Sequence, residues 1–137
     1  MGRPEGLRLE PIGLVQSPIT DRASAPKQGR EGAPGARLVI GREYAAGLAG
    51  VEAGSEMLVF TWLHLADRST LQVHPRGDPD APTRGVFTTR SPDRPNPIGI
   101  HRVRVTSVSG TELSVTDMEA VDGTPVIDLK PVRDEGC

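Results

Sequence analysis

The chain has 137 residues, a formal net charge of −2 and 25% charged residues of both signs. A chain of this length forms one domain with a modest core, and its mixed charge is not that of a general polyanion-binding protein. No apolar run is long enough to span a membrane, and the polar start MGRPEG does not resemble a signal peptide. The single cysteine, Cys137, excludes a disulfide or a cysteine-ligated zinc within one chain, so we expect a cytoplasmic protein.

Short strands dominate the expected secondary structure, because Gly 16 and Pro 13 are abundant while aromatic residues are only 3%. A strand over residues 7–18 is followed by a long loop over residues 19–37. A strand at 37–41 and a short helix within 43–54 come next. The most apolar run, residues 57–65, predicts a central strand buried on both faces. The last elements expected are a strand at 84–90, a hairpin around Ser109-Gly110-Thr111, and a strand after the Asp122-Gly123 turn.

These elements predict a mainly β, single-domain protein with one or two short helices. We expect a small antiparallel β-barrel, because closure removes the exposed edges of a strongly bent sheet. The barrel domain is expected over residues 7–132, between a flexible N-terminal tail, residues 1–6, and a C-terminal tail, residues 133–137. The glycine-rich stretch 29–35 follows no strand and opens no clear helix, so neither a Rossmann dinucleotide fingerprint nor a P-loop is present.

Few residues have the spacing of a catalytic or metal site. His64, His74 and His101 are far apart and lack the spacing of zinc ligands, so no metal is expected. No G-x-S-x-G elbow supports a serine hydrolase. His64 stands at the end of an expected strand, where a hydrogen-bonded structural histidine is the commoner interpretation.

The stretch FTTRSPDRPNPIGIHRV, residues 87–103, combines prolines with arginines. Each proline fixes its own φ and pushes the preceding residue away from helical geometry, so little conformational freedom remains to be lost on binding. Between residues 84 and 104, five arginines stand against one aspartate, a local charge of +4. Arg90 and Arg94 present planar donor forks suited to carboxylate or phosphate, and Asn96 offers both a donor and an acceptor. The stretch predicts an anion-binding surface.

Plainer interpretations of the same residues stay open. A stiff turn with solvated arginines explains the proline stretch equally well, and residues 92–95 also match the P-x-x-P ligand of aromatic-groove domains. In VDGTPVIDLKP, residues 121–131, Asp-Gly is an ordinary hairpin turn. Asp128 and Lys130 lie two apart on one side of a strand, where cross-strand pairing is sufficient to explain them.

Three motifs in one order resemble the TrmO/TsaA-like methyltransferases. GVFTTRSPDRPNPIGI is similar to that family's G-V-F-A-T-R-S-P-x-R-P-N-P-I-G-[LM], and VDGTPVIDLKP to its V-D-G-T-P-V-[LIV]-D-[IL]-K-P. IGLVQSP matches I-G-x-[IV]-x-S-P and is followed by Pro26-Lys27-Gln28 at the family's P-[RK]-Q. The chain departs from the pattern at Leu65, where many members have glutamine, and at Val132, where many have an aromatic residue.

The resemblance implies a non-Rossmann β-barrel that binds S-adenosylmethionine as a homodimer. It also implies a tRNA-modifying enzyme, since characterised bacterial members methylate the exocyclic nitrogen of threonylcarbamoyladenosine beside the anticodon. By position, the family's cofactor contacts fall on Pro26, Lys27, Gln28, His64, Leu65, Arg90, Ile100, Ala120, Val121, Asp122 and Gly123.

The chemistry of these side chains agrees with that cofactor. We expect Arg90 to bind the cofactor's carboxylate, and Asp122 or nearby carbonyl groups to accept its cationic end. Leu65, Ile100 and Val121 are expected to provide the apolar face for its adenine.

On the acceptor side, His64 is the expected general base, because the acceptor nitrogen must lose a proton. Arg94 and Asn96 are expected to contact the substrate's phosphate or base, with Asp128 and Lys130 as further substrate-binding candidates. Two alternatives stay open: an S-adenosylmethionine-dependent methyltransferase of a small metabolite, and a non-catalytic barrel that binds RNA or protein.

Overall fold

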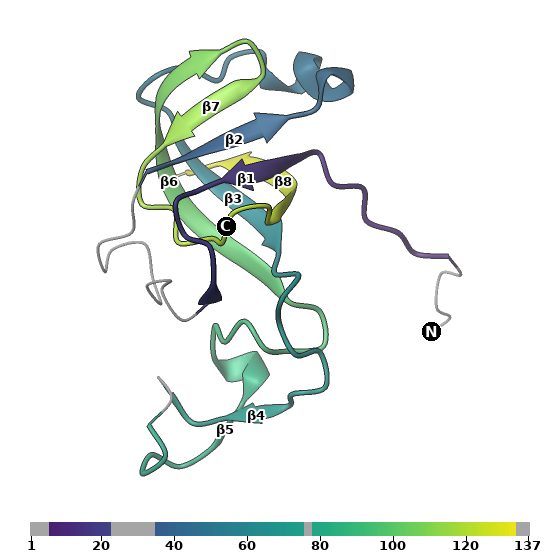
Figure 1. Cartoon of the computed structure of the whole chain (residues 1–137), viewed down its shortest axis with the longest axis vertical. Helices are drawn as coiled ribbons and strands as arrows, with labels where there is room; N and C mark the ends of the chain where they lie inside the picture. Colours follow the sequence, from purple (N-terminus) through teal and green to yellow (C-terminus); the bar gives the residue numbers. More distant parts are fainter. Residues whose placement is uncertain (1–5, 23–34, 76–77, 134–137) are drawn as a thin grey trace.

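Six antiparallel strands close into a barrel in the order β1-β2-β7-β6-β3-β8 (Figure 1). The computed structural model describes residues 6–22, 35–75 and 78–133. The strands of the barrel are β1 (Gly13–Gln16), β2 (Ala36–Ile40), β3 (Glu56–Trp62), β6 (Ile98–Ser109), β7 (Glu112–Val115) and β8 (Pro125–Pro131). The predicted fold class, a small antiparallel barrel, is confirmed.

An arm of two short strands lies apart from the barrel, at the bottom of Figure 1. It consists of β4 (Gln72–Val73), β5 (Arg84–Gly85) and the single 3₁₀ turn η5 (Val86–Thr88). The arm leaves the barrel after β3 and returns at the start of β6, so the proline stretch is its returning segment. A second 3₁₀ helix, η3 (Arg42–Leu48), follows β2. No helix of the described part of the chain is long and apolar enough to cross a membrane.

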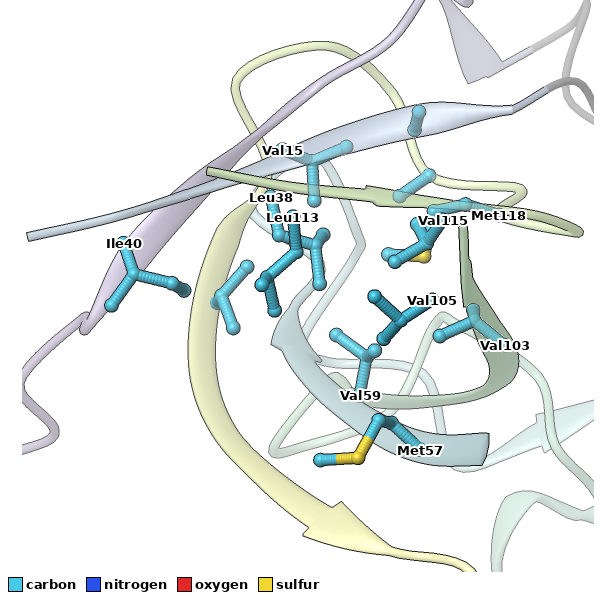
Figure 2. Packing of buried hydrophobic residues seen from close by; sticks show 13 residues of the cluster. Val15, Leu38, Ile40, Met57, Val59, Val103, Val105, Leu113, Val115 and Met118 are labelled. Atoms are coloured by element: carbon cyan, nitrogen blue, oxygen red, sulfur yellow. The ribbon is translucent and has the colours of Figure 1, made fainter. Parts of the chain in front are cut away.

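Strict alternation along the strands builds the core. In β6 every second residue from Gly99 to Val105 is buried while the residues between them are exposed, as a strand with one face on the core requires. β6 pairs with β3 over its first half and with β7 over its second, so one long strand bends across two neighbours. Figure 2 shows the buried aliphatic side chains that fill the interior. None of the aromatic residues is among the fully buried core, which suits a barrel of small diameter.

Several predicted elements need correction. Residues 7–12 are not a strand, because Leu7 and Leu9 are 79% and 51% exposed and have no core to cover. β3 ends at Trp62 and buries one face only, since its outward residues are half-buried. Residues 84–90 form a two-residue strand and a 3₁₀ turn, because their carbonyl groups converge on Arg94 and an extended strand would point them apart. The helix expected within 43–54 is the short 3₁₀ helix η3.

The hairpin and the last strand are confirmed. β6 and β7 are joined by Gly110-Thr111, and Gly110 has φ +61°, which favours glycine. Gly123, with φ +85°, makes the turn that precedes β8. The predicted limits of the barrel domain and of its two tails stay predictions, and residues 1–5 and 134–137 lie outside the described part of the chain.

An ion-pair cluster on the outer face of β3 and β6 predicts a pH-dependent contribution to stability. Arg102 and Arg104 each donate to Glu56, at 2.9 and 3.1 Å, and their hydrogen bonds hold the pKa of that carboxyl below its ordinary value. A lowered folded-state pKa stabilises the fold above the unfolded-state pKa and is lost as pH falls through the folded-state value. We therefore expect Glu56→Gln to lower the urea midpoint at about pH 7 and to leave it unchanged at about pH 2. If the wild-type and Glu56→Gln urea midpoints differ by the same amount at both pH values, the ion pairs do not explain the difference. Added salt should reduce the difference in midpoint at neutral pH, because it screens exposed ion pairs.

Candidate active site

Most of the predicted cofactor contacts line one open cleft between the barrel and the arm. They come from three separate stretches of sequence: the residues just after β3, the proline stretch that runs into β6, and the segment between β7 and β8. The members that line it are His64, Leu65, Arg90, Ile100, Ala120 and Val121. Leu65 and Ile100 are 50% and 39% exposed, so the cleft offers apolar surface to a ligand.

Two arginines from other parts of the sequence, Arg22 and Arg68, hold the proline stretch in place. Arg22 donates to both carboxylate oxygens of Asp93, at 3.0 and 3.1 Å, and to the carbonyl of Leu65 at 3.2 Å. Arg68 donates to the carbonyl of Pro95 and to Asn96 Oδ1, and its guanidinium lies 5.0 Å from the centre of the Trp62 ring. These bonds tie the two segments that connect the arm to the barrel.

Arg94, which belongs to the proline stretch itself, stabilises it by hydrogen bonds to its backbone. Its guanidinium donates to the carbonyl groups of Val86, Thr89 and Ser91, at distances between 2.5 and 3.1 Å. Planar donor forks are suited to such multiple bonds, whereas the point charge of lysine is not. Because these carbonyls already occupy the guanidinium, a contact of Arg94 with substrate stays a prediction without geometric support.

Arg90 is the arginine of the proline stretch that has no recorded hydrogen bond or ion pair to any described residue. It is exposed and lines the cleft, as does Arg84, which is also unpaired within the described part of the chain. Phe87 lies between them in sequence and is 79% exposed on the same cleft. The arm therefore presents two available cations and one exposed aromatic ring.

A polar network in which His101 and Thr61 are buried lies beside the cleft. His101 Nε2 lies 2.7 Å from Thr61 Oγ1, and His101 Nδ1 lies 2.5 Å from Glu119 Oε1. His101 is 4% exposed and Thr61 is fully buried. His101 points into the barrel, as do Val103 and Val105 at every second position of β6. This alternation is the sequence signal that could have revealed that His101 is buried. Glu119 carried no such signal.

Gly99 is required beside this network. A Cβ atom there would lie 2.5 Å from Thr61 Oγ1 and 2.8 Å from His101 Nε2, closer than real contacts allow. We expect Gly99→Ala to lower the free energy of unfolding by about 1–3 kcal/mol, measured by urea titration. Gly47→Ala is the matched control, because nothing lies within 4 Å of a Cβ at that position. Equal stability of the two variants would contradict the expected clash.

The remaining predicted residues lie elsewhere. Asp122 lines a shallow depression beside β1, β2 and β7, and its Oδ1 accepts the Ser17 N–H at 3.0 Å. Asp128 and Lys130 are exposed on β8 and pair with each other at 3.4 Å. Asn96 lies outside the cleft lining and accepts from Arg68. Pro26, Lys27 and Gln28 lie outside the described residues, and neither Gly123 nor Asp122 lines the cleft.

No three His, Cys, Asp or Glu side chains come together as metal ligands within residues 6–22, 35–75 and 78–133. The exposed His64 has no recorded partner among these residues, whereas His74 Nδ1 lies 2.8 Å from the Ala81 carbonyl oxygen.

Fold and site together define a small antiparallel barrel with an arginine-bearing arm beside an open cleft that is lined by both apolar and charged side chains. Residues 14–135 match the model of the tRNA-methyltransferase O N-terminal domain, and the chain belongs to that family.

Relatives and solved structures agree with this membership. The chain is 43% identical to an S-adenosyl-L-methionine-binding protein of Archaeoglobus fulgidus, over 93% of this chain and 90% of the relative. It is also 43% identical to a protein of Methanothermobacter thermautotrophicus named "Probable S-adenosyl-L-methionine-binding protein", over 94% and 92%. The structure of TrmO from Pseudomonas aeruginosa superposes with a TM-score of 0.73 at 28% identity. The alignment covers 94% of this chain but 57% of that TrmO chain.

Proposed function

We propose that this protein is an S-adenosylmethionine-dependent methyltransferase that acts on tRNA. The observation that carries the proposal is the convergence of His64, Leu65, Arg90, Ile100 and the 120–121 segment on one cleft. These residues come from distant parts of the sequence, and a family pattern alone does not require that they meet. The S-adenosylmethionine-binding relatives support the cofactor.

The residues of the cleft fit this cofactor. S-adenosylmethionine carries a carboxylate, an ammonium, a sulfonium and an adenine. The guanidinium of Arg90, which has no partner within the described part of the chain, suits the carboxylate. The exposed side chains of Leu65 and Ile100, with the half-buried Val121, suit the adenine. Arg22 and Arg94 fix the loop that carries Arg90, so little ordering is left for binding.

When bound, the cofactor supplies a methyl group on a positively charged sulfur, which is a good leaving group. The protein's contribution is then chiefly to align the acceptor nitrogen with that methyl carbon and to exclude water. The acceptor's N–H proton leaves as the N–C bond forms. His64 is exposed on the cleft and is the histidine we propose as its acceptor.

Phe87 favours a nucleic acid over a small metabolite as the methyl acceptor. An aromatic ring that is 79% exposed is suited to stack on an unpaired base, and Arg84, three residues before it and on the same cleft, is a candidate for phosphate. Threonylcarbamoyladenosine beside the anticodon is such an exposed base. We propose it as the acceptor, with the exocyclic nitrogen as the methylated atom.

A nucleoside mass profile tests the acceptor. tRNA from cells that lack the protein should have lost methylated threonylcarbamoyladenosine, and the wild-type gene should restore it, whereas Phe87→Ala should restore it poorly. An unchanged level of the methylated nucleoside would remove this acceptor. Cofactor turnover without RNA methylation would then favour a methyltransferase of a small metabolite. Absence of cofactor binding would favour a non-catalytic barrel that binds RNA or protein.

The homodimer and the cytoplasmic location belong to the same proposal. The outer face of β3 supports a dimer, because the aromatic side chains of Phe60 and Trp62 are not fully buried there and lie outside the cleft lining. Sedimentation of the purified protein tests the dimer.

A further inference from the structure

The segment between β7 and β8 carries two carboxylates in different surroundings. Asp122 is exposed, faces the depression beside β1, and accepts the Ser17 N–H. Glu119 is half-buried and lines the cleft that also holds Arg90. The sequence motif draws attention to Asp122, but the structure places Glu119 on the side where the cofactor is proposed to bind.

His101 fixes the position of the Glu119 carboxylate. Its Nδ1 lies 2.5 Å from Glu119 Oε1, and its Nε2 is engaged by Thr61 Oγ1 at 2.7 Å. With both ring nitrogens bonded and only 4% of the residue exposed, the imidazole has one orientation. Gly99 leaves the space that this arrangement needs.

The carboxylate retains capacity to accept further bonds. Ionised carboxylates have about four acceptor positions. Among the described residues, His101 is the side chain that hydrogen-bonds to the Glu119 carboxylate, at Oε1. The Glu119 side chain is 15% exposed, which leaves part of it open to the cleft while most of it is shielded from water. In such surroundings a charge interacts more strongly with an opposite charge than it does on an open surface.

We infer that Glu119, and not Asp122, accepts the cationic end of S-adenosylmethionine, and that His101 is the positioning residue that holds it there. Arg90 and Glu119 then give the cleft a positive and a negative group that match the cofactor's carboxylate and its cationic end. The assignment rests on the proposed cofactor binding and is independent of the RNA acceptor.

Two variants that remove charge while keeping shape test the assignment by calorimetric titration with S-adenosylmethionine. Glu119→Gln keeps an oxygen for His101, and Asp122→Asn keeps an oxygen for the Ser17 N–H. We expect Glu119→Gln to weaken binding roughly tenfold or more and Asp122→Asn to change it less than about twofold. The opposite order, or no effect of Glu119→Gln, would overturn the assignment. Absence of binding by the wild-type protein would instead remove the proposed cofactor, and the assignment with it.

Cofactor fragments separate the two cationic groups. S-adenosylhomocysteine keeps the ammonium but lacks the sulfonium, and 5′-methylthioadenosine lacks both. If Glu119→Gln weakens the binding of S-adenosylhomocysteine as much as that of S-adenosylmethionine, Glu119 contacts the ammonium. If it weakens the binding of S-adenosylmethionine alone, Glu119 contacts the sulfonium. Equal weakening of 5′-methylthioadenosine would overturn the assignment, because Glu119 would then contact the ribose or adenine.

A measurement on the wild-type protein covers the case in which Glu119→Gln does not fold. The ¹³C resonance of the Glu119 side-chain carboxyl should move when S-adenosylmethionine is added and should move much less with 5′-methylthioadenosine. Equal movement with both ligands, or none with either, would overturn the assignment.

Discussion

Arg90→Gln should bind S-adenosylmethionine roughly tenfold or more weakly than the wild-type protein, since a charge-assisted pair with the cofactor's carboxylate is lost. Arg90 is the cleft-lining arginine of the proline stretch without a partner among the described residues, so its removal should leave the fold intact. Calorimetric titration measures the affinity, and thermal unfolding without ligand checks the fold.

Arg84→Gln is the control for that variant. Arg84 is also exposed, unpaired within the described residues and part of the cleft lining, but it lies outside the motif positions of the family's cofactor contacts. Its loss should change cofactor affinity by less than about twofold. If both variants weaken cofactor binding equally, general positive charge and not a specific carboxylate contact explains the role of Arg90.

Arg94→Lys should loosen the whole returning segment of the arm. A lysine ammonium cannot reach the carbonyls of Val86, Thr89 and Ser91 with the geometry of a guanidinium. The Val86 carbonyl would keep the Thr89 N–H and hydroxyl as donors, whereas the half-buried Thr89 and Ser91 carbonyls would lose their side-chain donor. Amide hydrogen exchange over residues 86–94 should therefore become roughly tenfold faster or more. Cofactor affinity should fall as well, because Arg90 belongs to the same loop.

Arg37→Lys provides the comparison for Arg94→Lys, since Arg37 is exposed on β2 and lies outside the cleft. It should leave both exchange and affinity unchanged. An Arg94→Lys protein with normal exchange and cofactor affinity, but weaker RNA binding, would show that Arg94 contacts substrate as the motif suggests.

Alternation and turn chemistry made the barrel predictable from the sequence. Local patterns indicate the alternating burial of β6, the turn at Gly110 and the apolar run of β3. Closure of the sheet into a barrel is then expected for a chain of many short strands. The arm was not predictable in the same way. Residues 84–90 look strand-like by their pattern, but the side chain of Arg94, eight residues after Val86, draws their carbonyl groups together in a 3₁₀ turn, and residue pattern alone does not show that contact.

The candidate site was predictable where motif positions meet on the cleft, as for Arg90 and Ile100. The sequence does not show on which side of a turn a carboxylate lies, and that feature decides which carboxylate belongs to the site. Glu119 and Asp122 are three residues apart, and nothing in the sequence tells which of them shares a cleft with Arg90. Nor does it show that Arg22, far along the chain, braces Asp93.

A crystal structure of this protein with S-adenosylmethionine would test most directly whether the cofactor binds between the arm and the barrel. We expect the ligand's carboxylate within hydrogen-bond distance of the Arg90 guanidinium, its cationic end beside Glu119, and its adenine against Leu65 and Ile100. Ligand density in the depression beside Asp122, with the cleft unchanged, would contradict this expectation.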